Sequence, residues 1–132
     1  MNMYDRSVSA SVLVVEDEFL IMEDIAEVLE DKGYEVLRAW NAEEALALVE
    51  TRDDIRIVFT DVNMPGEIDG LDLAHVVRER WPHIGLIVTS GAVRAAEIEL
   101  PEQGLFIPKP YPPEAVARTI RQLLGASASG AP

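Results

Sequence analysis

Three carboxylates stand in the sequence where buried runs of apolar residues end. Glu16 and Asp17 come directly after the run Val12–Val15, and Asp61 comes directly after Ile55–Thr60. Carboxylates that share one site repel one another, so they need a cation. Oxygen ligands without histidine or cysteine favour a hard ion, Mg²⁺ or Ca²⁺, and few protein ligands with room for water favour Mg²⁺.

A lysine and two hydroxyl groups follow two other runs. Thr89 and Ser90 come at the end of the run that begins at Ile84, and Lys109 follows Leu105–Ile107. A carboxylate accepts a phosphoryl group covalently, and a metal ion offsets the negative charge of that group. A lysine pairs with phosphoryl oxygens, and a hydroxyl group can hydrogen-bond one of them. Together these residue types predict phosphoryl chemistry.

Each of these residues has a simpler explanation when it is taken alone. Asp17 suits the start of a helix, Asp61 suits a turn, and Lys109 suits a solvated surface. The simpler explanations lose weight because the residues follow different strands whose ends converge in one crevice, as the carboxyl ends of parallel strands do.

Five short apolar runs are the candidate strands that position these residues. Most of them lack polar alternation, which is typical of strands buried on both faces of a parallel sheet. They are Val12–Val15, Tyr34–Ala39, Ile55–Thr60, Ile84–Thr89 and Leu105–Ile107. The second run carries the most polar residues, so we expect it at the edge of the sheet.

Helical patterns fill the segments between the runs. Asn41 and Glu44 form a capping-box pattern, which is typical of the start of a helix. A second segment, near Ala92–Glu99, is short and only weakly helical in pattern, and it ends at Pro101. Three apolar stripes have helical spacing. The first consists of Ile21, Ile25, Val28 and Leu29 and ends before Gly33, and the second consists of Leu73, Val77 and Trp81 and ends before Pro82. The third consists of Val116, Ile120, Leu123 and Leu124 and follows Pro113. The alternation predicts an α/β fold with a doubly wound, flavodoxin-like parallel sheet of five strands in the order 2-1-3-4-5 and helices on both faces.

The composition limits the classes of protein that this chain represents. It has 132 residues, 48% hydrophobic residues and no cysteine, which fits one domain in a reducing cytoplasm. The net charge of −13 argues against direct nucleic-acid binding, because phosphate backbones repel such a surface. No apolar run approaches the ~20 residues that span a bilayer, and residues 1–10 lack the apolar stretch of a signal peptide. We therefore predict a cytoplasmic protein without a membrane partner.

The domain organisation that we expect is simple. Residues 1–10 form an N-terminal extension, residues 11–124 form one domain, and the small polar residues 125–132 form a flexible tail. A stand-alone protein and a domain cut from a longer chain both fit this organisation.

Five short motifs together resemble the receiver domains of bacterial two-component response regulators, the CheY-like family. The motifs are Val14-Val15-Glu16-Asp17-Glu18, Asp61-Val62-Asn63-Met64-Pro65-Gly66, Asp69-Gly70-Leu71, Thr89-Ser90-Gly91 and Phe106-Ile107-Pro108-Lys109-Pro110. Each motif alone is weak, but the combination is specific and extends from about Ser11 to Leu124. The resemblance implies a phosphorylation switch. A sensor histidine kinase or a phosphotransfer protein would supply the phosphoryl group, and binding to an unidentified downstream protein would change.

The resemblance also implies a role for each residue of the site. Asp61 would be the phosphoryl acceptor and a ligand of Mg²⁺. Asp17, and Glu16 partly through water, would be the other acidic ligands, and the backbone carbonyl of Asn63 would complete the metal site.

Three further roles come from the same resemblance. Lys109 would bind the phosphoryl group, and its bond to Pro110 is a candidate cis peptide. Ser90 would be the switch hydroxyl, with Thr89 as the alternative, because the preceding loop is longer than usual by one residue. Phe106 would be the switch aromatic.

The sequence departs from the family pattern between Gly91 and Gly104, a segment that is shorter than usual and contains Pro101. In this family the region forms much of the output surface. The sequence therefore does not predict the partner interface, nor whether the chain forms a homodimer.

Two other functions compete with the phosphorylation switch. The first is an interaction module that keeps the fold without being phosphorylated, and the intact acids with Lys109 argue against it. The second is a hydrolase with an aspartyl-phosphate intermediate, which would need a second carboxylate close after the nucleophile. Asn63 stands there instead, so we expect no enzyme beyond Mg²⁺-dependent self-phosphorylation and autodephosphorylation.

Overall fold

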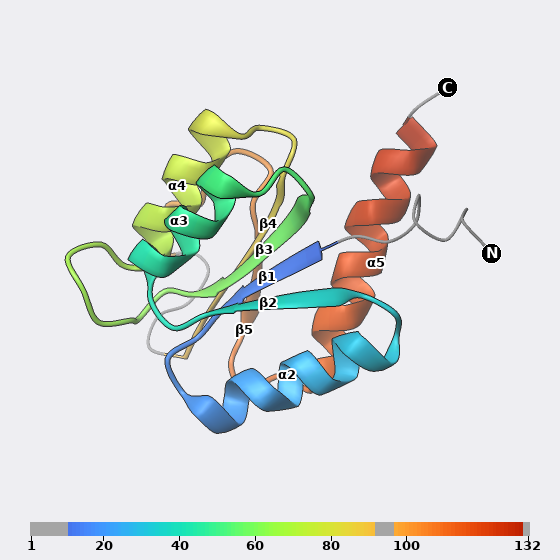
Figure 1. The fold of residues 1–132 in the computed structure, drawn as a ribbon, viewed down its shortest axis with the longest axis horizontal. Coiled ribbons are helices and arrows are strands. Elements are labelled where there is room, and N and C mark those ends of the chain that lie inside the picture. Colours follow the sequence, from blue (N-terminus) through green and yellow to red (C-terminus); the bar gives the residue numbers. More distant parts are fainter. Residues whose placement is uncertain (1–10, 92–96, 131–132) are drawn as a thin grey trace.

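Five parallel strands form one sheet in the order β2-β1-β3-β4-β5 (Figure 1). The structure is a computed structural model and describes residues 11–91 and 97–130. The strands are β1 (Ser11–Val15), β2 (Glu35–Ala39), β3 (Ile55–Asp61), β4 (Gly85–Ser90) and β5 (Leu105–Pro108). The predicted sheet order is confirmed, and the most polar strand, β2, lies at an edge as its pattern indicated.

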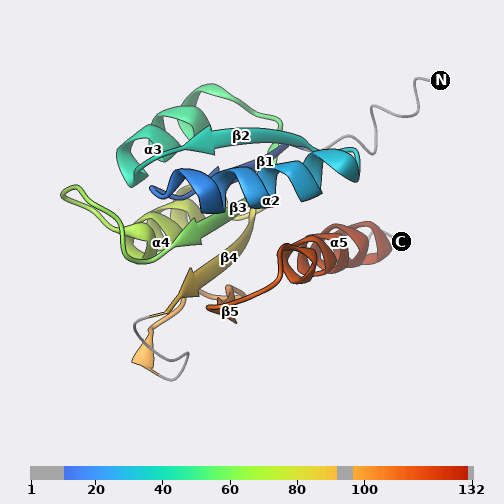
Figure 2. The same ribbon diagram turned by 90° about the horizontal axis from the view of Figure 1, so that it is seen from below.

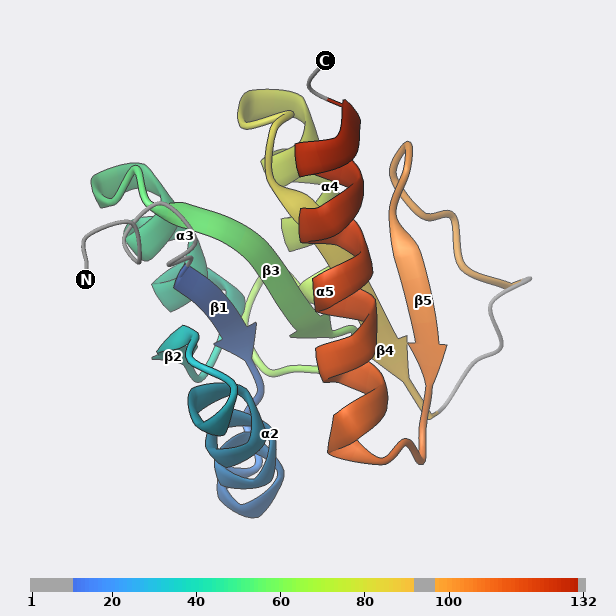
Figure 3. The same cartoon turned by 90° about the vertical axis from the view of Figure 1, so that its right-hand side faces the viewer.

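Helices cover both faces of this sheet, as the sequence predicts. Helices α3 and α4 pack against one face, and α2 and α5 pack against the other (Figures 2 and 3). Their bounds are α2 (Phe19–Asp31), α3 (Ala42–Thr51), α4 (Gly70–Arg80) and α5 (Pro113–Gly130). Within the described residues, no helix combines the length and the apolar character that a bilayer-spanning segment requires.

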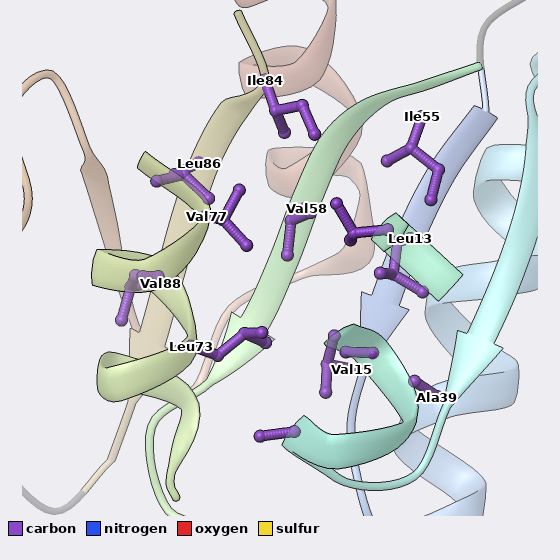
Figure 4. Close-up of a cluster of buried hydrophobic side chains, with 14 of the residues drawn as sticks. Leu13, Val15, Ala39, Ile55, Val58, Leu73, Val77, Ile84, Leu86 and Val88 are labelled. Atoms are coloured by element: carbon purple, nitrogen blue, oxygen red, sulfur yellow. The ribbon is translucent and has the colours of Figure 1, made fainter. Parts of the chain in front are cut away.

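The core consists of two apolar layers, one on each side of the sheet. Alternate residues of β1 serve the two layers: Leu13 and Val15 face α3 and α4, whereas Val12 and Val14 face α2 and α5. Figure 4 shows the first layer, in which Leu13, Val15, Val58, Leu86 and Val88 from the strands meet Leu73 and Val77 from α4. Burial on both faces explains why the strand runs lack polar alternation.

Local signals set most of the helix ends. The Asn41 side chain accepts the Glu44 N–H at 2.8 Å and begins α3, while the Glu44 carboxylate accepts the Trp40 N–H at 2.8 Å. Gly33 has a φ of 96° directly after the last turn of α2, a left-handed conformation that glycine adopts without strain. Pro113 is the first residue of α5, where its missing N–H is not needed.

The structure places several boundaries differently from the sequence prediction. Strands β3 and β4 each extend one residue further, to Asp61 and Ser90, because these residues pair with the neighbouring strands. Helix α5 continues to Gly130, beyond the last residue of the predicted apolar stripe, Leu124. The extension at residues 1–10 and most of the weak helical segment, residues 92–96, lie outside the described residues.

Candidate functional site

The three carboxylates meet at the carboxyl ends of β1 and β3. Val15 of β1 pairs with Thr60 of β3, so the next residue of each chain segment, Glu16 and Asp61, lies at the same level of the sheet. Asp17 joins them, and one oxygen from each of the three carboxylates lies within 4.8 Å of the others. Glu16 and Asp61 are buried, whereas Asp17 is exposed. The acidic group is therefore open to solvent on one side.

Lys109 reaches this group from the end of β5. Its Nζ donates to Asp61 Oδ2 at 2.7 Å and lies 3.8 Å from Glu16 Oε1. Its backbone N–H donates to the Ser90 carbonyl at 3.2 Å, which holds the residue beside the end of β4. The Lys109–Pro110 bond is cis, as the resemblance implied.

The remaining oxygens of the two buried carboxylates have different partners. Asp61 Oδ1 accepts the Asn63 N–H at 3.1 Å, and Glu16 Oε2 accepts the Glu18 N–H at 3.0 Å. Glu16 Oε1 is buried and has no hydrogen-bond partner among the described residues. A buried carboxylate oxygen without a donor, beside two other carboxylates, fits a hard cation such as Mg²⁺.

The electrostatics of the site follow from burial and from this crowding. Burial raises the pKa of Glu16 from 4.5 to about 7, the charges of Asp61 and Asp17 add to the effect, and the Glu18 N–H and Lys109 oppose it. Burial lowers the pKa of Lys109, but the hydrogen bond and charge of Asp61, with the charge of Glu16, outweigh it and raise this pKa. The site holds its lysine charged and disfavours a full set of charged carboxylates.

The two candidate switch hydroxyls have different surroundings. Ser90 Oγ accepts a hydrogen bond from Asn63 Nδ2 at 3.3 Å, so it faces the loop that follows Asp61. The Thr89 hydroxyl is fully buried and has no hydrogen-bond partner within the described part of the chain. Phe106 pairs with Val88 in the sheet and is half-buried against the layer formed with α3 and α4.

The Asp69-Gly70 motif has a steric reason that its sequence alone did not reveal. Asp69 caps α4 in a reciprocal capping box with Asp72. A Cβ atom at Gly70 would lie 1.7 Å from the Asp61 carbonyl oxygen, closer than any contact allows. Glycine therefore lets the first turn of α4 lie directly against the backbone of Asp61 and fixes its position.

Tyr111 belongs to the surroundings of the site, although sequence reasoning missed it. Its ring packs edge-on against Phe59 with the ring centroids 5.8 Å apart. Its hydroxyl is buried without a hydrogen-bond partner among the described residues. Burial, together with the charges of Glu16 and Asp61, raises its pKa. The available signal was an aromatic residue directly after Lys109-Pro110.

An aromatic pair lies at the start of α2, next to the acidic group in the sequence. The rings of Phe19 and Trp40 are stacked with centroids 6.2 Å apart and an interplanar angle of 10°. Phe19 follows Asp17 and Glu18 and is 63% exposed. The fluorescence of Trp40 should therefore respond to changes in the segment that carries the exposed Asp17 carboxylate.

Comparisons with known proteins agree with this arrangement. Residues 12–121 match the response regulator receiver domain family. The chain is 33% identical over 120 residues to the chemotaxis protein CheY1 of Helicobacter pylori, covering 86% of this chain and 96% of CheY1. It is 36% identical over 121 residues to the hydrogenase transcriptional regulatory protein HoxA of Cupriavidus necator, covering 89% of this chain. Among solved structures, the response regulator TrrA of Thermotoga maritima in complex with Mg²⁺–BeF has a TM-score of 0.75 and 28% identity, covering 86% of this chain and 98% of TrrA.

The extent of the matches differs between these relatives. The chain spans 24% of the length of HoxA, so the likeness to that protein concerns one of its parts. It spans nearly the whole of CheY1 and of TrrA. The chain belongs to the response regulator receiver domain family.

Proposed function

We propose that this chain is a phosphorylation-dependent signalling switch in which Asp61 accepts a phosphoryl group from the phosphohistidine of a sensor histidine kinase or phosphotransfer protein. The contact that carries this proposal joins Lys109 Nζ to Asp61 Oδ2 at 2.7 Å, within an acidic group that also contains Glu16 and Asp17. A two-component receiver implies a histidine kinase partner in general, and receiver domains typically are not true enzymes.

The transfer itself needs little from the protein except position and charge. An oxygen of the Asp61 carboxylate attacks phosphorus, a new oxygen–phosphorus bond forms, and the nitrogen–phosphorus bond of the donor breaks. The bonding electron pair stays on the donor imidazole, which takes up a proton from solvent. The Lys109 ammonium group pairs with the phosphoryl oxygens and so offsets their charge.

Glu16, Asp17 and Asp61 would hold Mg²⁺, with the backbone carbonyl of Asn63 as a further ligand. The orphaned Glu16 Oε1 and the close approach of the three carboxylates support this assignment, as does the Mg²⁺–BeF complex of the related TrrA. A bound Mg²⁺ supplies positive charge that stabilises the negative charge of the phosphoryl group.

Ser90 and Phe106 would carry the signal away from the site. Ser90 is favoured over Thr89 because its hydroxyl already accepts a hydrogen bond from Asn63, whereas the equally buried Thr89 hydroxyl has no hydrogen-bond partner among the described residues. A phosphoryl group on Asp61 offers strong acceptors that would draw the Ser90 hydroxyl inward. Phe106 is half-buried beside Val88, so it would respond to the space that this movement frees.

Intact-mass measurement after treatment with a small acyl phosphate and Mg²⁺ tests the acceptor. The parent protein should gain one phosphoryl group, and Asp61→Asn should gain none. Asp53→Asn, which changes an exposed aspartate, is the matched control and should label like the parent. Labelling of Asp61→Asn to the same extent would refute the assignment, and absence of labelling in the parent would favour the unphosphorylated interaction module.

Tryptophan fluorescence tests the metal site independently. A Trp81→Phe background leaves Trp40, which stacks on Phe19 near the acidic group, as the reporter. Mg²⁺ should change its emission in a saturable way, and Asp17→Ala should abolish the change. An unchanged titration in Asp17→Ala would reject the proposed ligand.

A further inference from the structure

A hollow lined by basic side chains lies between the turn that follows α2 and the first half of α5. Its volume is about 360 Å³, and its lining residues are Lys32, Tyr34, Glu114, Ala117, Arg118 and Arg121. Small-molecule sites in proteins begin at about 300 Å³. Helices α2 and α5 pack together on the same face of the sheet (Figure 3). Since α2 begins after the acidic group and has 13 residues, the hollow is about 20 Å further along that helix.

The charge of this hollow is opposite to that of the protein as a whole. The chain has 24 acidic and 11 basic residues besides histidine, for a net charge of −13. Three of the lining residues are cationic, and the single carboxylate, Glu114, lies 3.2 Å from Lys32 at the side of the hollow. The guanidinium groups of Arg118 and Arg121 therefore remain as an excess of positive charge.

Within residues 11–91 and 97–130, Arg118 and Arg121 differ from most other cations in having no ion-pair or hydrogen-bond partner. Arg38, Arg52 and Arg80 each pair with carboxylates. In the part of the chain that the structure describes, neither Arg118 nor Arg121 forms an ion pair or a side-chain hydrogen bond, although carboxylates are abundant. The two residues are three positions apart on α5, so their side chains are neighbours on one side of the helix.

The shape of the hollow and the kind of cation indicate what would fill it. Guanidinium groups bind phosphate oxygens in a bidentate geometry, which a lysine does not provide. The other lining residues of the hollow are not cationic: Ala117 is buried and small, and Tyr34 is half-buried. An acidic peptide would need a longer row of cations, whereas a compact anion needs only this cluster.

We propose that this hollow is a binding site for a small phosphate-bearing anion, held by Arg118 and Arg121 with Lys32 at its edge. The site is separate from the acidic group and does not depend on phosphorylation of Asp61. Its occupancy would act on the contact between α2 and α5, which Lys32 and Glu114 already bridge.

Amide NMR titration of the full chain with inorganic phosphate, pyrophosphate and ADP tests the proposal. The ionic strength is held constant, and EDTA removes divalent cations, so that the acidic group repels the probes. Saturable shifts should be confined to residues 32–34 and 114–121, with pyrophosphate tighter than phosphate. Tighter binding of ADP than of pyrophosphate would assign a nucleotide, and equal binding would assign the phosphate groups alone.

A pair of double variants separates the site from general electrostatics. Arg118→Gln with Arg121→Gln should weaken pyrophosphate binding at least about tenfold, because charged hydrogen bonds are lost. Arg56→Gln with Arg80→Gln changes the net charge equally away from the hollow and should leave binding unchanged. Equal loss in both variants, shifts that never saturate, or tighter binding of a short glutamate peptide at the same residues would overturn the proposal.

Discussion

Replacing Glu16 by glutamine should stabilise the metal-free protein at neutral and alkaline pH. The charged carboxylate is unfavourable in the folded state because it is buried beside Asp61 and Asp17, and its pKa rises from 4.5 to about 7. Glutamine keeps an oxygen that can accept the Glu18 N–H but carries no charge. Removing this charge should therefore relieve a cost that folding imposes on the parent.

The size and the pH range of the effect follow from proton linkage. Each tenfold change in proton affinity corresponds to about 1.4 kcal/mol, so the change from 4.5 to about 7 corresponds to about 3 kcal/mol. The folded state of the parent holds the proton more tightly than the unfolded state. The contribution of the protonated Glu16 to stability is therefore complete below pH 4.5 and is lost as the pH rises through about 7.

Urea unfolding in EDTA at a series of pH values measures this difference. Glu16→Gln should exceed the parent in stability most strongly near pH 8, and the two should approach each other near pH 5. Glu27→Gln, an exposed position on α2, should follow the parent at every pH. Addition of Mg²⁺ should stabilise the parent more than Glu16→Gln. A variant that is equally or less stable near pH 8, or a difference that does not vary with pH, would refute the reasoning.

Three further outcomes follow from the structure. Gly70→Ala should destabilise the protein by about 3 kcal/mol or more in thermal melts, because the new Cβ would lie 1.7 Å from a backbone oxygen. Gly125→Ala is the control and should be neutral or stabilising, because no atom lies near its Cβ. Arg78→Met should cost about 1–3 kcal/mol in urea unfolding, since three carbonyl oxygens lose their donor, and Arg80→Met should cost much less. Asp54→Asn should lower stability at neutral pH, because hydrogen bonds to a neighbouring arginine and serine lower the pKa of Asp54. That difference should shrink as acid protonates the parent carboxylate, and a pH-independent difference would contradict it.

Local sequence patterns were sufficient to predict the fold and the order of its elements. Continuous apolar runs such as Val12–Val15 indicate strands that are buried on both faces, and the amphipathic stripes between them indicate helices. Both patterns can be recognised within a short stretch of sequence. The helix ends at Asn41, Gly33 and Pro113 could also be predicted from local signals, because each of these residues acts on the backbone within one turn of the helix. The motifs around Asp61 and Lys109 carried the resemblance to the family. The convergence of these residues at one site followed from strands that end on the same side of a parallel sheet.

Features that depend on contacts between segments distant in the sequence could not be predicted from local patterns. Pairing with neighbouring strands, rather than composition, carried β3 to Asp61 and β4 to Ser90. His75 and Arg78 of α4 bind the carbonyl oxygens of Glu99 and Glu102, and no local sequence pattern predicts these contacts.

The periodicity of apolar residues also does not predict steric fit or the burial of individual groups. Nothing near Gly70 in the sequence reveals that the Asp61 carbonyl fills the space of its Cβ, and nothing near Tyr111 reveals a buried hydroxyl. The hollow between α2 and α5 likewise exists only after the helices pack. Sequence patterns record which side of an element is buried, whereas contacts, clashes and pKa values depend on which atoms the packing brings to that side.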